Sequence, residues 1–217
     1  MTTLAIDLRL ERQHQKTPPG FKSSARKETI EKAITRLGPI FFEQTAIQLS
    51  MSLPGKVLVK RVGRRIRRAR IVEVEAYLGP RDLASHSSKG RTARTEVMFG
   101  PAGRAYVYFI YGMHWMFNVV AGRIGRAHAV LIRAAEPLDG WDADLSGPGK
   151  LARQFAIRKN HNGLELTGDE FHFVPDPAYS PRIARSKRIG VDYAGEWKDR
   201  PLRFIDVRNP VATRLRS

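Results

Sequence analysis

The chain has 217 residues and no cysteine, and it carries 38 Lys and Arg against 21 Asp and Glu, a formal net charge of +17. Its length fits one domain of ordinary size, and its 42% hydrophobic residues are enough to fill a core. The lack of cysteine excludes disulfides, thiolate zinc sites, iron–sulfur clusters and cysteine nucleophiles. The basic charge favours a polyanionic partner, either a nucleic acid or an acidic membrane surface.

No segment of the sequence has the features of a membrane span or a targeting signal. No stretch approaches the roughly 20 uncharged apolar residues that a spanning helix needs. The N-terminus lacks the basic-then-apolar order of a secretory signal, and the early Asp7 and Glu11 argue against a transit peptide. We therefore expect an intracellular protein without a membrane partner.

The first part of the chain differs in composition from the rest. Residues 1–36 mix Gln, Lys, Pro and Ser with few large apolar side chains, which predicts a flexible basic arm. Residues 37–217 are then the folded domain. Within it, residues 46–53 predict a short helix that ends at Pro54-Gly55, because this pair cannot easily continue a helix.

A long β-hairpin is predicted next. Residues 56–62 alternate polar and apolar side chains, Gly63 supplies a turn, and residues 66–78 form the second strand. We expect its outward positions to be cationic. These positions are Lys60, Arg61, Arg64, Arg65, Arg67, Arg68 and Arg70.

A second hairpin and a further strand follow. Residues 105–111 and 115–120 predict strands on either side of Gly112, residues 130–134 predict another strand, and residues 150–157 predict a helix. No strand–helix–strand alternation of βαβ length occurs. We therefore expect an α+β fold, with a single domain built on an antiparallel β-sheet core, a protruding β-hairpin and peripheral short helices.

The second strand of the first hairpin carries two carboxylates and a phenol on one face. Successive side chains of a strand point to opposite faces, so Glu73, Glu75 and Tyr77 lie together. The residues expected on the inward face are Val72, Val74 and Ala76. One interpretation pairs the carboxylates with nearby arginines such as Arg68 and Arg70. The other is a general base that activates water, beside an aromatic stacking surface for a planar substrate.

The polar loop after this strand contains Asp82 and His86. Together with the two carboxylates of the strand, these side chains could form a hard-metal site of the nuclease type, with Glu73, Glu75, Asp82 and His86 as ligands. A lone loop histidine is more often incidental. Spacing alone therefore leaves the metal site and the water-activating site open.

The second hairpin is rich in aromatic residues. Val107, Phe109 and Trp115 are expected in the core, whereas Tyr111 and Met113 flank the glycine turn, where large side chains tend to be exposed. In a polyanion-binding protein, such a tip is suited to wedge between base pairs from the minor groove. An enzyme that acts on a base must extrude it from the stack, and another group should occupy the vacated space. An exposed aromatic tip, a basic surface and a pair of carboxylates would therefore fit together in one enzyme that acts on a base of DNA.

Several separate motifs stand in order over about residues 41–204. They are RIVEVEAYLGP at 70–80, ASH at 84–86, YVYFIYGM at 106–113, Asn118, LIRAAEP at 131–137, SGPGKL at 146–151 and AGEW at 194–197. In this order and at this spacing they resemble the alkyladenine DNA glycosylases, also called methylpurine or 3-methyladenine DNA glycosylases. Where many members have Thr-Pro-Arg-Asn, this chain has Thr92-Ala93-Arg94-Thr95, which we expect to loosen the loop behind the pocket.

The resemblance implies a role for each matching residue of the pocket. Glu75 would be the general base that positions and deprotonates the attacking water, and Glu73 would be structural. Tyr77 and His86 would sandwich the flipped purine, and Tyr108 would close the pocket from the edge of the purine.

The same resemblance implies contacts with DNA besides the aromatic sandwich around the purine. Tyr111 would be inserted into the minor groove in place of the extruded nucleotide, with Met113 supporting this wedge. Asn118 would lie against the purine and disfavour the exocyclic amine of normal guanine, and Arg133 would lie near the backbone of the flipped nucleotide. The family fold is a single mixed α/β domain with an antiparallel β-sheet core.

The implied function is that of a monofunctional DNA repair glycosylase. It would flip alkylated purines, and possible further substrates such as etheno or deaminated purines, out of duplex DNA. Hydrolysis of the N-glycosidic bond would leave an abasic site. No metal or other cofactor is expected, and a monomer would bind double-stranded DNA. Two alternatives from other classes stay open: a metal-dependent nuclease and a non-enzymatic nucleic-acid-binding protein.

Overall fold

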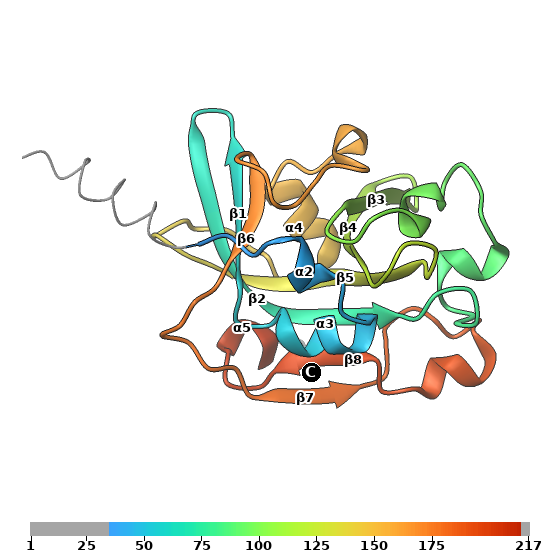
Figure 1. Ribbon diagram of the computed structural model, residues 1–217. Helices are drawn as coiled ribbons and strands as arrows, with labels where there is room; N and C mark the ends of the chain where they lie inside the picture. Colours follow the sequence, from blue (N-terminus) through green and yellow to red (C-terminus); the bar gives the residue numbers. More distant parts are fainter. Residues whose placement is uncertain (1–34, 214–217) are drawn as a thin grey trace, which may run out of the picture. The chain divides into compact units, whose positions relative to one another are not determined.

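The computed structural model of this chain describes residues 35–213, which form an antiparallel sheet surrounded by short helices (Figure 1). The strands are β1 (Val57–Val62), β2 (Arg65–Tyr77), β3 (Ala105–Ile110), β4 (His114–Ala121), β5 (His128–Pro137), β6 (Phe171–Val174), β7 (Ile183–Ser186) and β8 (Arg203–Asp206). The α-helices are α2 (Pro39–Phe42), α3 (Ala46–Ser52), α4 (Pro148–Gln154) and α5 (Pro210–Thr213). The short 3₁₀ helices are η1 (His86–Lys89), η2 (Glu96–Phe99), η3 (Lys159–His161) and η4 (Gly195–Asp199). The predicted α+β class is confirmed.

Strand β2 is the centre of the sheet. The strand order is β3-β4-β5-β2-β1-β6, and every neighbouring pair is antiparallel. One edge of β2 pairs with β5. Its other edge pairs with β1 over residues 65–70 and with β8 over residues 73–75, and β8 pairs in turn with β7. The second half of β2 is therefore enclosed on both edges, and residues 71–76 are all buried.

Two β-bulges interrupt the pairing of β2 with β5. The register shifts on each side of Glu73, so Val72 of β2 and Arg133 of β5 have no partner in the ladder. Bulges re-aim the side chains around them. Val72 is buried as predicted, but it does not pack with Val74 and Ala76, because it lies in a small separate cluster with a residue of α5. The other two belong to the main core.

The main core lies between the sheet and the helices α2, α3 and α4. It contains Phe42 of α2, Leu49 of α3, Leu151 of α4, and Phe117 and Phe204 of the sheet, all essentially inaccessible to solvent. Burying side chains of this size is the main favourable contribution to folding. Helices of only four to seven residues are marginal alone, so these three depend on packing against the sheet.

Both predicted hairpins are present. The β1–β2 hairpin projects from the body of the molecule, in cyan at the upper left of Figure 1. Its predicted cationic surface is confirmed at Arg61, Arg64 and Arg65, which are exposed. It is wrong at Lys60, which is 3% exposed and lies over the ring of Phe171. Burial there lowers the pKa of the Lys60 ammonium.

Three strands and one helix boundary differ from the sequence-based expectation. Strands β6, β7 and β8 are not predicted, since each has only four residues. The predicted helix at 150–157 begins earlier, at Pro148, where the missing N–H of proline is tolerated. Residues 1–34 of the expected basic arm lie outside the described residues. Among residues 35–213, no helix is long and apolar enough to cross a membrane.

Candidate active site

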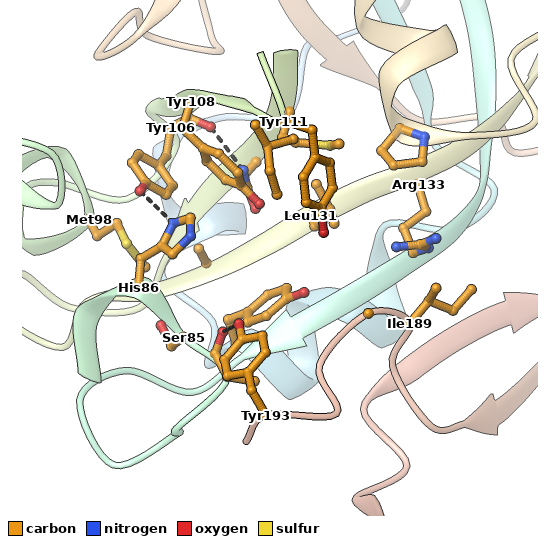
Figure 2. Close-up of a pocket in the computed structure, with 18 residues that line it drawn as sticks. Ser85, His86, Met98, Tyr106, Tyr108, Tyr111, Leu131, Arg133, Ile189 and Tyr193 are labelled. Carbon is orange, nitrogen blue, oxygen red and sulfur yellow. Dashed lines mark hydrogen bonds between the residues drawn. The ribbon is translucent and has the colours of Figure 1, made fainter. Parts of the chain in front are cut away.

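A pocket of about 250 Å³ opens beside the β3–β4 hairpin (Figure 2). Its walls come from the end of β2 and the loop after it, from β3, β4 and β5, from the first residue of α4, and from the loop before η4. Five tyrosines contribute to the lining: Tyr77, Tyr106, Tyr108, Tyr111 and Tyr193. The volume lies just below the range of about 300–1,000 Å³ for drug-sized ligands, which suits one small planar group.

Glu75 lies behind the pocket wall. Its carboxylate is completely buried, and its Oε2 accepts a hydrogen bond of 2.9 Å from the Tyr77 hydroxyl. Its Oε1 accepts a 2.9 Å hydrogen bond from the backbone N–H of Ile189 and lies 3.3 Å from Nη1 of Arg133. These three partners all line the pocket. The carboxylate therefore contacts the pocket wall through all three of these residues.

Glu73 is held by two arginines. Its Oε1 accepts hydrogen bonds from Nε of Arg133 at 3.0 Å and from Nε of Arg203 at 2.6 Å. The interpretation that the carboxylates pair with arginines is thus confirmed. The predicted partners Arg68 and Arg70 are wrong, because they form ion pairs elsewhere. Arg68 pairs with Asp139, and Arg70 pairs with Glu136 and Asp176.

Arg133 bridges the two carboxylates from its bulged position in β5. Burial alone would lower the pKa of its guanidinium, but the negative charges of Glu75 and Glu73 outweigh burial and raise this pKa above its ordinary value. Arg133 therefore supplies a permanent positive charge at the back of the pocket. The bulge matters here because a side chain in the regular ladder would have a different direction.

Tyr77 is fixed from both ends. Burial, together with the charge of Glu75, raises the pKa of the Tyr77 phenol well above its ordinary value, so the hydroxyl keeps its proton and donates a hydrogen bond to Glu75. The guanidinium of Arg188 lies 4.8 Å from the centre of the Tyr77 ring. Arg188 is bound in turn by both oxygens of Asp82, at 2.6 and 2.9 Å, and both side chains are fully buried. This ion pair fastens the loop after β2 to the loop before η4.

His86 forms an aromatic group with two tyrosines on one side of the pocket (Figure 2). Its Nδ1 is 2.9 Å from the Tyr106 hydroxyl, and its ring meets the Tyr108 ring edge to face at a centroid distance of 4.5 Å. Burial, with the positive charges of Arg94 and Lys89, lowers the pKa of His86 to about 4. Burial also raises the pKa of Tyr108. All three rings are therefore uncharged near neutral pH.

Asn118 lies on β4 in the pocket lining and is 3% exposed. Its Nδ2 donates a hydrogen bond of 3.1 Å to the backbone carbonyl of Tyr106. This bond fixes the orientation of the amide against the pocket. Any group that approaches this wall therefore meets a positioned polar side chain.

The loop of residues 92–95 contains a buried threonine that forms several hydrogen bonds, and the expected loosening relative to the family stays a prediction. The Thr95 hydroxyl donates to the carbonyl of Gly90 at 2.9 Å and accepts from the backbone N–H of Thr92 at 2.9 Å. Thr95 is 3% exposed. Its hydroxyl therefore provides the hydrogen bonds that close this loop.

The tip of the β3–β4 hairpin presents two large side chains. Tyr111 and Met113 are 76% and 67% exposed, as expected, but only Tyr111 also lines the pocket. The turn is tight, with φ of 54° at Tyr111 and 68° at Gly112. A left-handed conformation at a residue other than glycine is uncommon and costs about 1–3 kcal/mol. The expectation that Phe109 is a core residue is wrong, since it is 44% exposed and packs against Trp115.

The metal site of the nuclease alternative is not assembled. Asp82 forms an ion pair with Arg188, Glu73 accepts hydrogen bonds from two arginines, and His86 is hydrogen-bonded to Tyr106. Within residues 35–213, no three His, Asp or Glu side chains lie where they could share a metal ion. The hard-metal arrangement predicted from spacing is therefore wrong in geometry.

Several residues of this site were not among the sequence-based candidates, including Arg188, Ile189 and Tyr193. Arg188 and Ile189 lie more than 100 residues from Tyr77 and Glu75, which they contact, and no local pattern marks them. Tyr193 is 70% exposed, lines the pocket, and donates a hydrogen bond of 3.3 Å to the carbonyl of Ala84. Its place just before the AGEW motif was the only available signal.

Comparison with known proteins gives one consistent result. Residues 40–210 match the family model described as methylpurine-DNA glycosylase (MPG). A protein of Anaeromyxobacter sp. (strain Fw109-5) is 47% identical over 180 residues, covering 82% of this chain and 93% of that protein. Relatives from Legionella pneumophila (strain Lens) and Myxococcus xanthus (strain DK1622) are 47% and 46% identical, covering 78% and 76% of this chain and 93% and 86% of their own lengths. All three carry the name "putative 3-methyladenine DNA glycosylase".

Proposed function

The chain belongs to the methylpurine-DNA glycosylase family, and from this premise we propose that it flips alkylated purines such as 3-methyladenine out of duplex DNA and hydrolyses their N-glycosidic bond. The observation that carries the proposal is a pocket the size of one base, lined with aromatic rings and backed by a buried carboxylate. We propose that a monomer binds the DNA.

The flipped base would bind between Tyr77 and the group of His86 and Tyr108. An alkylated purine such as 3-methyladenine is positively charged in DNA. A protonated histidine would repel it, whereas the low pKa of His86 keeps the imidazole neutral. The electron-rich faces of the tyrosine rings attract a cationic ring. Asn118, held by its bond to a backbone carbonyl, would discriminate against the exocyclic amine of guanine.

Glu75 would act as the general base. Water bound at the wall formed by Tyr77, Ile189 and Arg133 would give its proton to the carboxylate while its oxygen forms a bond to C1′ of the sugar. The bond from C1′ to the purine nitrogen breaks, and its electron pair leaves with the base. Tyr77 and Ile189 orient the carboxylate through their hydrogen bonds. Arg133 contributes positive charge near the backbone of the flipped nucleotide.

Tyr111 would fill the space that the base vacates. Its ring is exposed at the tip of a strained turn, and backbone strain at an exposed aromatic residue is typical of functional positions. Insertion of an aromatic ring into the minor groove unstacks and kinks the duplex. Met113, exposed on the other side of the same turn, would support the wedge without reaching the pocket.

The product is expected to be an abasic site without strand cleavage. A lyase needs an amine nucleophile near the sugar, and the residues that line the pocket include no lysine. Treatment with borohydride during the reaction should therefore trap no covalent protein–DNA adduct. A trapped adduct would contradict the hydrolytic mechanism.

The decisive experiment uses duplexes methylated with dimethyl sulfate, with and without EDTA. We expect free 3-methyladenine to be released in both arms, and strand breaks only after alkali. Strand breaks without alkali that EDTA abolishes would establish the nuclease instead, and binding without base release would establish a non-enzymatic binding protein.

Parallel duplexes with one ethenoadenine or one hypoxanthine define the range of substrates. These bases are neutral and leave less readily, so their release needs protonation of the leaving group and should have a narrower pH optimum than release of 3-methyladenine. If all three rates shared one pH profile, leaving-group protonation would not be part of the mechanism.

A further inference from the structure

The outer part of the β1–β2 hairpin is a free-standing ribbon. Strand β6 pairs with β1 only as far as Lys60, and β5 pairs with β2 only from Ala69 onward. Residues 62–67 therefore lie beyond the ends of both neighbouring strands, and β1 and β2 pair there only with each other. Figure 1 shows this ribbon extending well past the rest of the sheet.

The ribbon and its two flanking residues, from Arg61 to Arg68, carry five arginines, and only two of them have side-chain partners among residues 35–213. Arg67 lies over the ring of Trp141 at 5.0 Å, and Arg68 pairs with Asp139 at 3.4 Å. Arg61, Arg64 and Arg65 are exposed, and no acidic side chain of residues 35–213 forms an ion pair with them. Uncompensated like charges oppose the compact state. Folding therefore does not account for this cluster.

The register shows where the ribbon points. Glu75 lies opposite Leu131, and Leu131 lies opposite Asn118. Because these strands are antiparallel, the direction from Glu75 toward Arg65 is also the direction from Asn118 toward Tyr111. The two hairpins thus project from the same end of the sheet. The middle of the β3–β4 pair and the middle of the β2–β1 pair are three strand spacings apart in the sheet, about 14 Å. The twist of about 20–25° per strand spreads the tips of the two hairpins further apart.

A short loop connects the foot of the ribbon with the pocket. Residues 138–147 run from the end of β5 to α4. At one end, Asp139 and Trp141 hold arginines of the ribbon. At the other end, Pro148 lines the pocket. The cationic ribbon and the pocket therefore border the same stretch of surface.

From this geometry we propose that the β1–β2 ribbon binds the phosphate backbone of the duplex beside the flipped base, through Arg61, Arg64 and Arg65. This inference rests on the proposed function and adds a second DNA contact to it. Guanidinium groups bind phosphates bidentately, and a two-stranded ribbon is narrow enough to follow a groove of DNA. Ten residues separate Glu75 from Arg65, about 33 Å along the strand, which is close to one turn of duplex, about 34 Å.

The test measures binding to a duplex with a single tetrahydrofuran abasic analogue, which cannot be cleaved, over a range of salt concentrations. Each phosphate contact adds about 0.9 to the slope of log affinity against log salt. The double variant R64S/R65S should lose about 1.8 of this slope. The matched control is R182S/R208S, which removes two exposed arginines at the ends of β7 and β8. Strand β8 pairs with β2 at the end of β2 away from the ribbon, and β7 and β8 lie at the bottom of Figure 1. Its slope should stay that of wild type.

Duplex length provides a second readout. Wild-type protein should bind a duplex of about three turns more tightly than one of about one turn, and R64S/R65S should lose this preference, whereas R182S/R208S should keep it. An unchanged slope in R64S/R65S, or equal losses in both double variants, would overturn the ribbon contact. Failure of wild-type protein to release any methylated base would instead refute the proposed function.

Discussion

The β1–β2 and β3–β4 hairpins project from the same end of the sheet but differ at their turns. In the first, Gly63 takes the left-handed position, with φ of 60°, and the neighbouring arginines are exposed. In the second, the left-handed position next to Gly112 is held by Tyr111. Glycine adopts this conformation freely, whereas tyrosine does so at a cost.

This difference separates two tasks in DNA binding. A turn that is free of strain and carries arginines gives affinity for phosphates whatever the sequence or the state of the bases. A strained turn that carries an exposed aromatic ring next to a pocket detects whether a base has left the stack. We therefore expect changes in the two hairpins, and in the pocket behind the second one, to have distinct effects.

The largest effect is expected at Glu75, where a substitution should change the rate of base release but not DNA binding. Glu75→Gln should slow release of 3-methyladenine by about 10²–10⁴-fold, the usual contribution of a general base, and leave DNA affinity unchanged because the exposed ends of both hairpins are not altered. Single-turnover release and anisotropy titration measure the two properties. Glu165→Gln, at an exposed carboxylate paired with Arg104, is the matched control. Near wild-type release by Glu75→Gln would remove this residue from the mechanism.

The second prediction concerns the tip of the β3–β4 hairpin. Tyr111→Ser should weaken binding to lesion DNA by about 5- to 150-fold, which corresponds to about 1–3 kcal/mol for an aromatic ring stacked on a base. Binding to undamaged duplex should change much less, because no base is then out of the stack. Tyr111→Phe keeps the ring and should retain lesion affinity. Equal losses on both DNAs would exclude the intercalating role.

A smaller effect is expected at Tyr193, across the pocket from Tyr108 in Figure 2. Loss of the ring in Tyr193→Ala should weaken lesion binding by about 0.5–1.5 kcal/mol, or roughly two- to tenfold. Tyr193→Phe removes only the 3.3 Å hydrogen bond to the Ala84 carbonyl and should bind almost as wild type. If both variants lost the same affinity, the hydrogen bond and not the ring would matter.

The smallest expected effect is a titration. The pKa of His86 is lowered from 6.5 to about 4 by burial and by Arg94 and Lys89. The unfolded chain then binds a proton at a higher pH than the folded chain does. Stability from the neutral His86 is therefore fully present above pH 6.5 and declines as the pH falls toward about 4. NMR titration of the imidazole measures this pKa directly, and a value near 6.5 would contradict the buried, neutral ring.

Local patterns predicted the parts of this fold that depend on neighbours in sequence. Alternating side chains and glycine turns gave both hairpins, and the period of two placed Glu73, Glu75 and Tyr77 on one face. Strands β6 to β8 escaped prediction, because four residues carry too little pattern and their pairing is set by partners far along the chain. The same holds for Lys60, whose burial depends on Phe171 from β6.

The candidate site divides in the same way. The resemblance of short motifs indicated Glu75, Tyr77, His86 and Tyr108, and the structure brings them to one pocket or to its wall. The incorrect arginine partners of Glu73 have a geometric cause. The bulge at Arg133 re-aims that side chain toward the carboxylates, and no sequence period announces a bulge.

By itself, the sequence determined the charge, the hairpins and the residue types that this chemistry needs, since composition and alternation are properties of neighbouring residues. Only the tertiary structure decided the partners of each carboxylate: Glu75 contacts Tyr77, Ile189 and Arg133, and Glu73 is held by Arg133 and Arg203. That choice depends on two bulges and on Arg188 and Ile189, which lie more than 100 residues from Tyr77 and Glu75. Contacts of this range form through packing of the whole sheet, which local patterns do not encode.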